Sequence, residues 1–98
     1  MKLPIVFRLE ASAEFNEAFD WYDQQQAGLG LDFLDRVADV LAQIELMPES
    51  YQMIFEDVRR AAIRRFPYSI FYRIETNQIT VLAVFHSRRD PKAWQSRV

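Results

Sequence analysis

The chain has 98 residues, half of them hydrophobic and 14% aromatic, and its formal net charge is −2. This length and composition are typical of a single folded domain, which we expect to span residues 1–98, and they exclude a disordered chain. The absence of Cys excludes disulfides and thiolate chemistry. With only one His to add to the carboxylates, we expect no metal site and no cofactor.

We expect no secretion signal at the N-terminus. The apolar run at residues 3–7 is interrupted by Pro4 and halted by Arg8, which makes it too short for the apolar region of such a signal. No stretch of the sequence approaches the roughly 20 apolar residues that a membrane span needs. We therefore expect a cytoplasmic protein without membrane contact.

Charge is divided unequally between the two halves of the sequence. Residues 1–56 carry three basic and eleven acidic side chains, whereas residues 57–98 carry nine basic and three acidic ones. Such halves can attract each other within one fold, or they can form an acidic helical side and a basic functional side. A pI near 5.3 argues against strong non-specific binding of nucleic acid, although a local basic patch remains compatible with it.

The first half of the chain predicts a strand and a helical hairpin. Residues 4–9 alternate as in a strand, and Ser12 is a candidate N-cap for a helix that follows. Gly28 is suited to a left-handed residue at a helix end. The second helix ends before Pro48. The apolar stripes of the two helices are Phe15, Ala18, Phe19 and Tyr22, and Leu34, Val37, Leu41 and Ile44.

The second half predicts the sheet on which that hairpin packs. The expected elements are an extended piece at 51–55, a strand or strand pair at 57–66, a strand at 68–74, a turn at 76–78, a central strand at 79–86 and a short helix that starts at Asp90-Pro91 and carries Trp94. The predicted fold class is α+β, with an antiparallel sheet of about four strands and an N-terminal helical hairpin packed on one face.

Arginines are the residues most suited to bind a partner. Four of them, Arg59, Arg60, Arg64 and Arg65, are expected on one strand, where they either form a solvated edge or bind an anion through their planar guanidinium groups. Two more, Arg88 and Arg89, follow the central strand, at a point where a sheet presents groups to a ligand.

Two other residues near these arginines have alternative interpretations. His86 is a candidate general base, but no orienting partner or nucleophile is evident near it, and such a His more often caps a turn or bonds a neighbouring backbone group. Trp94 fits either a core position in the last helix or a stacking platform. Without a nucleophile motif or a phosphate-cradling Gly loop, the residues by themselves favour an interaction domain over an enzyme.

Three apolar side chains of the sheet exceed what one helix pair can cover. They are Phe71, Leu82 and Val84. We therefore expect a partner segment to lie on them or along the sheet edge.

Two segments carry a family resemblance that extends over nearly the whole chain. RFPYSIFYR (residues 65–73), and VFHSRRDP (residues 84–91) with Trp94, resemble the RelE/ParE superfamily of toxins from bacterial type II toxin–antitoxin modules. The second segment is most similar to the ParE-like branch. The resemblance implies a growth-inhibiting toxin, often linked to plasmid stabilization, that is neutralised by a small cognate antitoxin.

The RelE-like branch implies an alternative, a ribosome-dependent endonuclease that cuts messenger RNA. Its late arginine falls on Arg88 and one of its two basic strand positions falls on Arg60, whereas the other falls on Ala62. Its further arginine and its catalytic tyrosine fall on Ser69 and Trp94, and an indole cannot take part in proton transfer at neutral pH. The alternative therefore requires an altered active site with Arg60 and Arg88 as charge stabilisers.

The ParE-like interpretation instead implies binding to a protein target, DNA gyrase, without catalysis. The expected target-binding residues are His86, Arg88, Arg89 and Trp94. The expected antitoxin-binding residues are Arg64, Arg65, Phe71, Leu82 and Val84. A further alternative is a non-toxic protein-binding module of the same fold.

Overall fold

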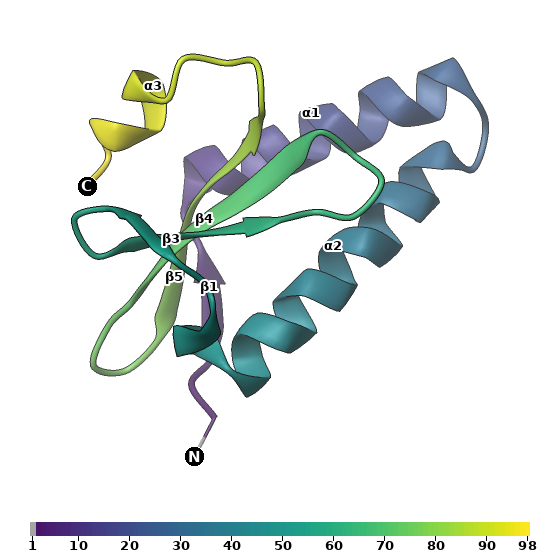
Figure 1. Cartoon of the computed structure of the whole chain (residues 1–98). Coiled ribbons are helices and arrows are strands. Elements are labelled where there is room, and N and C mark those ends of the chain that lie inside the picture. The colour runs from purple at the N-terminus through teal and green to yellow at the C-terminus, as the bar shows by residue number, and fades with distance from the viewer. Residues whose placement is uncertain (1) are drawn as a thin grey trace.

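The computed structural model describes residues 2–98. A β-strand, a helical hairpin, four further strands and a short C-terminal helix follow one another along the chain (Figure 1). Their bounds are β1 Ile5–Phe7, α1 Leu9–Gln25, α2 Leu29–Leu46, a 3-10 turn η1 Pro48–Ser50, β2 Met53–Phe55, β3 Val58–Ala62, β4 Tyr68–Ile74, β5 Ile79–His86 and α3 Lys92–Gln95.

The sheet has five strands in the order β1-β5-β4-β3-β2. The strands from β2 to β5 are antiparallel neighbours, and β1 lies parallel to β5 with Ile5 opposite Ile79. The α+β class and the packed helical hairpin are therefore confirmed. The prediction of about four antiparallel strands did not include β1 as a parallel edge strand. Strand β1 is only three residues long and pairs with a strand more than 70 residues away.

The two helices form the predicted antiparallel hairpin, and its connection is tightly held. Gly28 adopts a left-handed conformation with φ of 91°. The Asp23 carboxylate accepts hydrogen bonds from the backbone N–H groups of Gly28 and Gly30, at 3.0 and 3.3 Å. The expected N-cap at Ser12 is wrong: α1 already begins at Leu9 because Arg8, still extended, leads straight from β1 into the helix.

One face of the sheet packs against α1 and α2. Phe33, Val37 and Ile44 of α2 are fully or almost fully buried against Tyr72 and other apolar residues of β4 and β5. Val37 and Ile44 of the predicted apolar stripe of α2 are buried as expected, whereas Leu34 is 39% exposed and the other buried positions are Phe33 and Val40.

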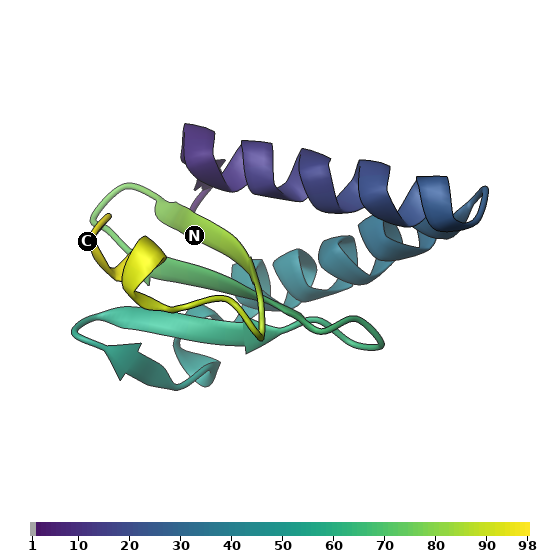
Figure 2. The same ribbon diagram turned by 90° about the horizontal axis from the view of Figure 1, so that it is seen from above.

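The opposite face is covered by the C-terminal part of the chain. The indole of Trp94 in α3 stacks on the ring of Phe71, with 4.4 Å between ring centroids, and it also contacts Phe55. Figure 2 shows α3 on the side of the sheet away from α1 and α2. The sheet is therefore enclosed on both faces by its own chain.

A β-bulge in β5 decides which of its residues face the helices. Tyr72 is opposite Val81 and Phe71 is opposite Ala83, so Leu82 is the extra residue. The alternation of side chains shifts at this point. Val84 consequently belongs to the core on the helical side, whereas Leu82 belongs to the core beneath α3.

Candidate partner-binding site

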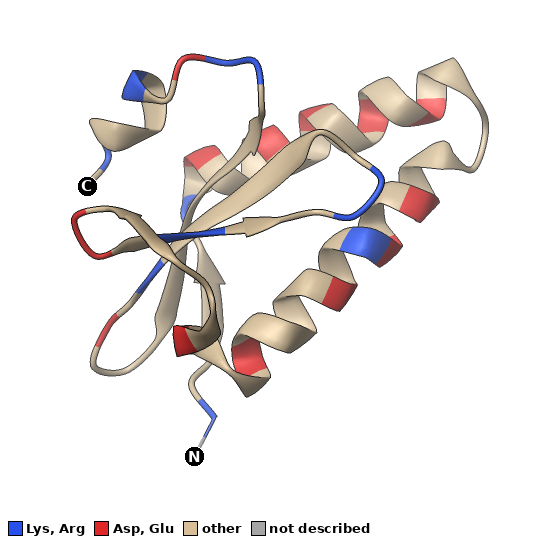
Figure 3. Cartoon of the chain, viewed as in Figure 1, with Lys and Arg blue, Asp and Glu red and all other residues tan. Residues whose placement is uncertain are grey.

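Two arginine pairs lie in loops at the same end of the sheet. Arg64 and Arg65 belong to the turn between β3 and β4, and Arg88 and Arg89 follow β5 (Figure 3). The two loops are joined by a hydrogen bond of 2.8 Å from the backbone N–H of Ser87 to the carbonyl of Pro67. We call Arg64, Arg65, Arg88 and Arg89 the basic end of the sheet.

Placing Arg64 and Arg65 on a strand with Arg59 and Arg60 was wrong. Strand β3 ends at Ala62, and Arg65 has a positive φ of 72°, which interrupts any extended run. The side chains of Arg64 and Arg65 are exposed in the turn. The turn therefore presents them to a partner more openly than a strand would.

Arg88 and Arg89, which follow β5, differ in the contacts that their side chains make with the rest of the chain. Arg88 is exposed, and its guanidinium makes no ion pair or hydrogen bond with any of residues 2–98. Arg89 lies 3.4 Å from the Glu14 carboxylate and over the Phe85 ring at 4.0 Å, yet its side chain is 50% exposed. Arg88 is thus free to meet a partner, and Arg89 is partly committed to α1.

His86 is tied to the backbone at the end of β5. Its Nδ1 accepts a hydrogen bond of 3.0 Å from the N–H of Arg88, and its ring meets that of Tyr68 edge-on at 5.1 Å. In the neutral imidazole the proton therefore resides on Nε2, which makes that nitrogen a donor. This geometry is that of a turn cap rather than of a general base.

The structure corrects the surface role of four apolar residues. Trp94 is 1% exposed, so it is a core residue and offers no surface for target binding. Phe71, Leu82 and Val84 are 7%, 0% and 1% exposed, so the expectation that they await an antitoxin segment was wrong. The physical reason is that α3 covers Phe71 and Leu82, while the bulge turns Val84 beneath the helices.

Arg60 lies beside a hollow on the α3 side of the sheet. Its Nε donates a hydrogen bond of 3.0 Å to the Ser69 hydroxyl. Arg60, Ser69, His86 and Arg89 are among the residues that line a hollow of about 250 Å³, whereas Arg88 is not. Of the two charge stabilisers expected for a ribonuclease, only Arg60 is at this position.

Glu14 and Arg97 form an interaction that the sequence did not predict. Two guanidinium nitrogens of Arg97 contact the Glu14 carboxylate at 2.8 and 3.1 Å, and both side chains are largely buried. This contact holds the pKa of Arg97 above its usual range. The two residues lie 83 positions apart and have no shared motif, so no sequence signal could have found the pair.

Glu14 and Arg97 also bind backbone groups along the edge of β5 that no strand covers. Strand β1 covers this edge only as far as Val81. Beyond it, the Glu14 carboxylate accepts a hydrogen bond of 3.1 Å from the N–H of Val84, and Arg97 donates one of 3.0 Å to the carbonyl of Leu82. The ion pair therefore satisfies two backbone groups that a neighbouring strand would otherwise bind.

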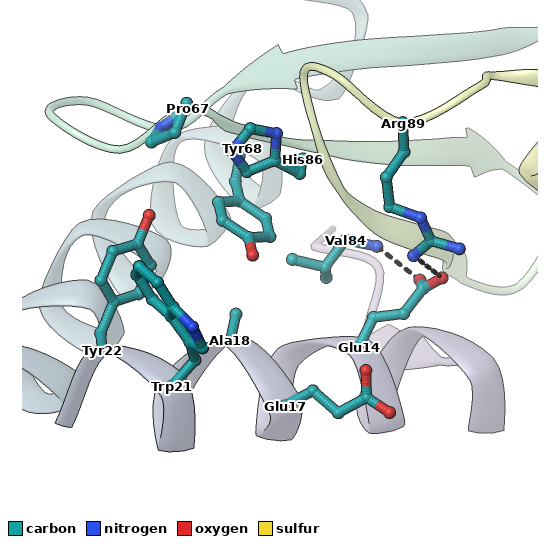
Figure 4. Close-up of a pocket in the computed structure, with 10 residues that line it drawn as sticks. All are labelled: Glu14, Glu17, Ala18, Trp21, Tyr22, Pro67, Tyr68, Val84, His86 and Arg89. Atoms are coloured by element: carbon teal, nitrogen blue, oxygen red, sulfur yellow. Dashed lines mark hydrogen bonds and ion pairs between the residues drawn. The ribbon is translucent and has the colours of Figure 1, made fainter. Parts of the chain in front are cut away.

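A further hollow lies between α1 and the sheet. It has a volume of about 490 Å³ and is open to solvent (Figure 4). Its lining residues are Glu14, Glu17, Ala18, Trp21, Tyr22, Pro67, Tyr68, Val84, His86 and Arg89. Burial raises the pKa values of the Tyr22 and Tyr68 hydroxyls. We call this the aromatic hollow; the sequence did not reveal it because its walls come from three separate segments.

Comparison with known proteins identifies the family. Residues 5–91 match the family model of the ParE toxin of the type II toxin–antitoxin system, parDE. A solved structure described as the chromosomal ParDE TA system from P. aeruginosa superposes with a TM-score of 0.76, over 87% of this chain and 96% of that one, at 15% sequence identity. No curated protein matched. Among residues 2–98, no helix has the length and apolar character of a membrane span. The chain belongs to the ParE toxin family of type II toxin–antitoxin systems.

Proposed function

We propose that the protein inhibits bacterial growth by binding a protein target and that a cognate antitoxin neutralises it. Family membership supports this proposal. The observation that carries the binding mode is the basic end of the sheet, where Arg64, Arg65 and Arg88 are exposed without an ion-pair partner among residues 2–98. Guanidinium groups presented on rigid loops match the carboxylates of an acidic protein surface.

The proposed target is DNA gyrase, as the resemblance to the ParE-like branch implies, and the proposed location is therefore the cytoplasm. A net charge of −2 gives the protein no general attraction to nucleic acid, so the arginines favour a local acidic patch on a protein. Arg88 and the partly held Arg89 are the proposed target contacts, with His86 fixing the turn that presents them.

The proposal is tested by inducing the protein in a bacterium without its antitoxin. Viable counts and trapped gyrase–DNA breaks are measured for the wild type and for the variant Arg88→Ala. The wild type should stop growth and accumulate breaks. The Arg88→Ala variant should bind its target at least about tenfold more weakly, a cost of about 1.4 kcal/mol, and so lose much of its toxicity.

Lys2→Ala is the matched control, because it also removes one exposed positive charge but lies at the other end of the molecule beside Glu45. It should be as toxic as the wild type. Circular dichroism establishes that all variants fold. Normal growth on induction of the wild type would instead favour a non-toxic binding module of the same fold.

A second candidate is a messenger RNA endonuclease with an altered site. The hollow that brings Arg60, His86 and Arg89 together favours it, because clustered cations can stabilise a developing phosphorane charge. Against it, Nδ1 of His86 already accepts a hydrogen bond, so the neutral ring offers no free acceptor to the 2′-hydroxyl. Site-specific messenger RNA ends that disappear with Arg60→Ala, but persist with Lys2→Ala, would establish this candidate instead.

The antitoxin is proposed to engage Arg64 and Arg65 through an acidic segment. The support is their exposure in a turn that projects beyond the body of the sheet (Figure 2). Co-expression with the antitoxin encoded beside this gene should restore growth and give a complex that co-purifies. The variant Arg64→Glu/Arg65→Glu should keep the fold but lose at least about tenfold in affinity for the antitoxin, because like charges then face each other.

A further inference from the structure

The aromatic hollow has walls made of four rings in succession. Trp21 meets Tyr22 edge-on at 5.1 Å, Tyr22 meets Tyr68 at 6.1 Å, and Tyr68 meets His86 at 5.1 Å. Trp21 and Tyr22 rise from α1, whereas the Tyr68 hydroxyl points down toward α1 from the sheet (Figure 4). Trp21 is 56% exposed, so its indole presents much of its surface to a ligand.

The hollow also carries one unmatched negative charge. Of its two carboxylates, Glu14 is occupied by Arg97 and Arg89. Glu17 is exposed and makes no ion pair or hydrogen bond within residues 2–98. The one cation of the lining, Arg89, is turned toward Glu14 and stacked over Phe85, at the opposite end from Trp21 (Figure 4).

The free polar groups of the hollow include both donors and acceptors. The Trp21 indole N–H and Nε2 of His86 donate. The Tyr22 and Tyr68 hydroxyls, which donate or accept, have no hydrogen-bond partner among the described residues, and the Glu17 carboxylate accepts only. A guanidinium is the complementary group, because it donates at every nitrogen and also stacks on aromatic faces, best on Trp. A volume of about 490 Å³ exceeds that of one side chain and leaves room for the adjoining peptide.

We propose that the aromatic hollow binds an arginine side chain of a partner polypeptide, with Trp21 stacked on the guanidinium and Glu17 paired to it. Pro67, the exposed aliphatic residue of the lining, contacts the adjoining residues of the segment. The site is separate in charge from the basic end of the sheet: one binds a cation and the other binds anions. Arginine binding at this site does not depend on whether gyrase is the target.

The test uses a blocked tripeptide, acetyl-Ala-Arg-Ala-amide, as the probe. Its control is the same peptide with citrulline, which has the shape of arginine without its charge. Binding is followed by the indole N–H signal of Trp21 in the NMR spectrum. The indole of Trp94, which is 1% exposed, serves as an internal reference. The arginine peptide should shift the Trp21 signal saturably and bind about fivefold more tightly than the citrulline peptide.

Two variants on α1 make the test specific. Glu17→Gln should weaken binding of the arginine peptide about fivefold and leave that of the citrulline peptide unchanged. Asp20→Asn removes an equally exposed acid that does not line the hollow, so it should change neither. Equal binding of both peptides, equal effects of the two variants, or no saturable shift of Trp21 would overturn the proposal.

Discussion

Folding strongly raises the pKa of the Tyr72 hydroxyl. Tyr72 is fully buried, and its hydroxyl donates a hydrogen bond of 2.6 Å to the carbonyl of Pro48. Burial raises its pKa to about 12, although the nearby Arg59 acts in the opposite direction. The hydroxyl thereby joins the central sheet to the turn that follows α2.

The raised pKa of Tyr72 predicts a loss of stability in alkali. Unfolded, the tyrosine ionises near pH 10, whereas folded it stays neutral to about 12, so stability present below pH 10 is lost between these values. One tyrosine contributes at most about 1.4 kcal/mol per pH unit. Urea unfolding at several pH values should show a smaller alkaline loss for Tyr72→Phe. Part of the loss persists because the pKa values of Tyr22 and Tyr68 are also raised. An unchanged pH profile would contradict the prediction.

The two tryptophans allow a direct comparison of burial. Trp94 is 1% exposed and stacked on Phe71, whereas Trp21 is 56% exposed. Trp94→Ala should lower the free energy of unfolding by about 3–5 kcal/mol, because it leaves a cavity beneath α3. Trp21→Ala should change it by about 0.5 kcal/mol or less. Denaturant unfolding measures both, and similar losses would show that α3 does not pack in solution as described.

At the scale of elements, Glu14 and Arg97 join α1, β5 and the C-terminal segment after α3. Because both are largely buried, removal of Glu14 leaves the charge of Arg97 unpaired, and removal of Arg97 leaves Glu14 with only the longer contact of 3.4 Å to Arg89. Glu14→Gln and Arg97→Gln should each cost about 3 kcal/mol of stability. The double variant should cost less than their sum, with a coupling of about 1–3 kcal/mol.

The control for this cycle is Asp20→Asn, an exposed acid on the same helix, which should shift stability by about 0.5 kcal/mol or less. Urea unfolding of all four proteins gives the coupling energy. Strict additivity of the two substitutions would mean that the ion pair does not exist in solution.

The two glycines of the hairpin constrain it in different ways. A Cβ at Gly30 would lie 2.9 Å from the backbone carbonyl of Phe19, so α1 and α2 would have to separate. Gly30→Ala should therefore cost about 1–3 kcal/mol, although alanine normally stabilises a helix relative to glycine by about 1 kcal/mol.

Gly28 has open space around it but a positive φ. Gly28→Ala should cost about 1–2 kcal/mol, and Gly28→Asn less, because asparagine tolerates the left-handed region. Thermal unfolding distinguishes the two positions: at Gly30 the loss should increase with side-chain volume, and asparagine should be worse than alanine there. The same order at both sites would refute the steric explanation for Gly30.

At the scale of the whole molecule, the charges are separated in space. Acidic residues dominate the helical hairpin, and arginines gather at the end of the sheet and on the C-terminal segment (Figure 3). This arrangement follows the division along the sequence, because the hairpin is built from residues 1–56 and three of the strands from residues 57–98. Among residues 2–98, the ion pairs that join the two regions are those of Glu14 with Arg97 and Arg89.

Charge separation predicts that antitoxin binding depends on salt. The association rate constant should fall as ionic strength rises, because an acidic segment is steered toward the basic end. Arg64→Ala/Arg65→Ala should reduce both the rate at low salt and its salt dependence, whereas Lys2→Ala should preserve them. Stopped-flow measurements over a range of salt concentrations provide the check, and a rate independent of salt would contradict it.

The sequence by itself determined the elements whose causes are local. The helical hairpin follows from apolar stripes with helical spacing and from Gly28. The hairpin of β4 and β5 follows from the alternation at 68–74, the polar turn at 76–78 and the apolar run at 79–86. The start of α3 follows from Asp90 and Pro91, and the Asp90 carboxylate indeed accepts a hydrogen bond from the N–H of Lys92. The positions of Arg88 and His86 at the end of β5 were equally evident, since strand ends are local features.

Only the tertiary structure decided what each of these residues contacts. Phe71 and Leu82 are apolar in the sequence, but they become buried only because α3 folds back over them. Val84 faces the helices because β5 contains one extra residue at the bulge. The pairing of Glu14 with Arg97 and the rings around the aromatic hollow likewise join segments far apart in the chain. Such contacts arise from packing of the complete fold, and packing has no periodic signature in the sequence.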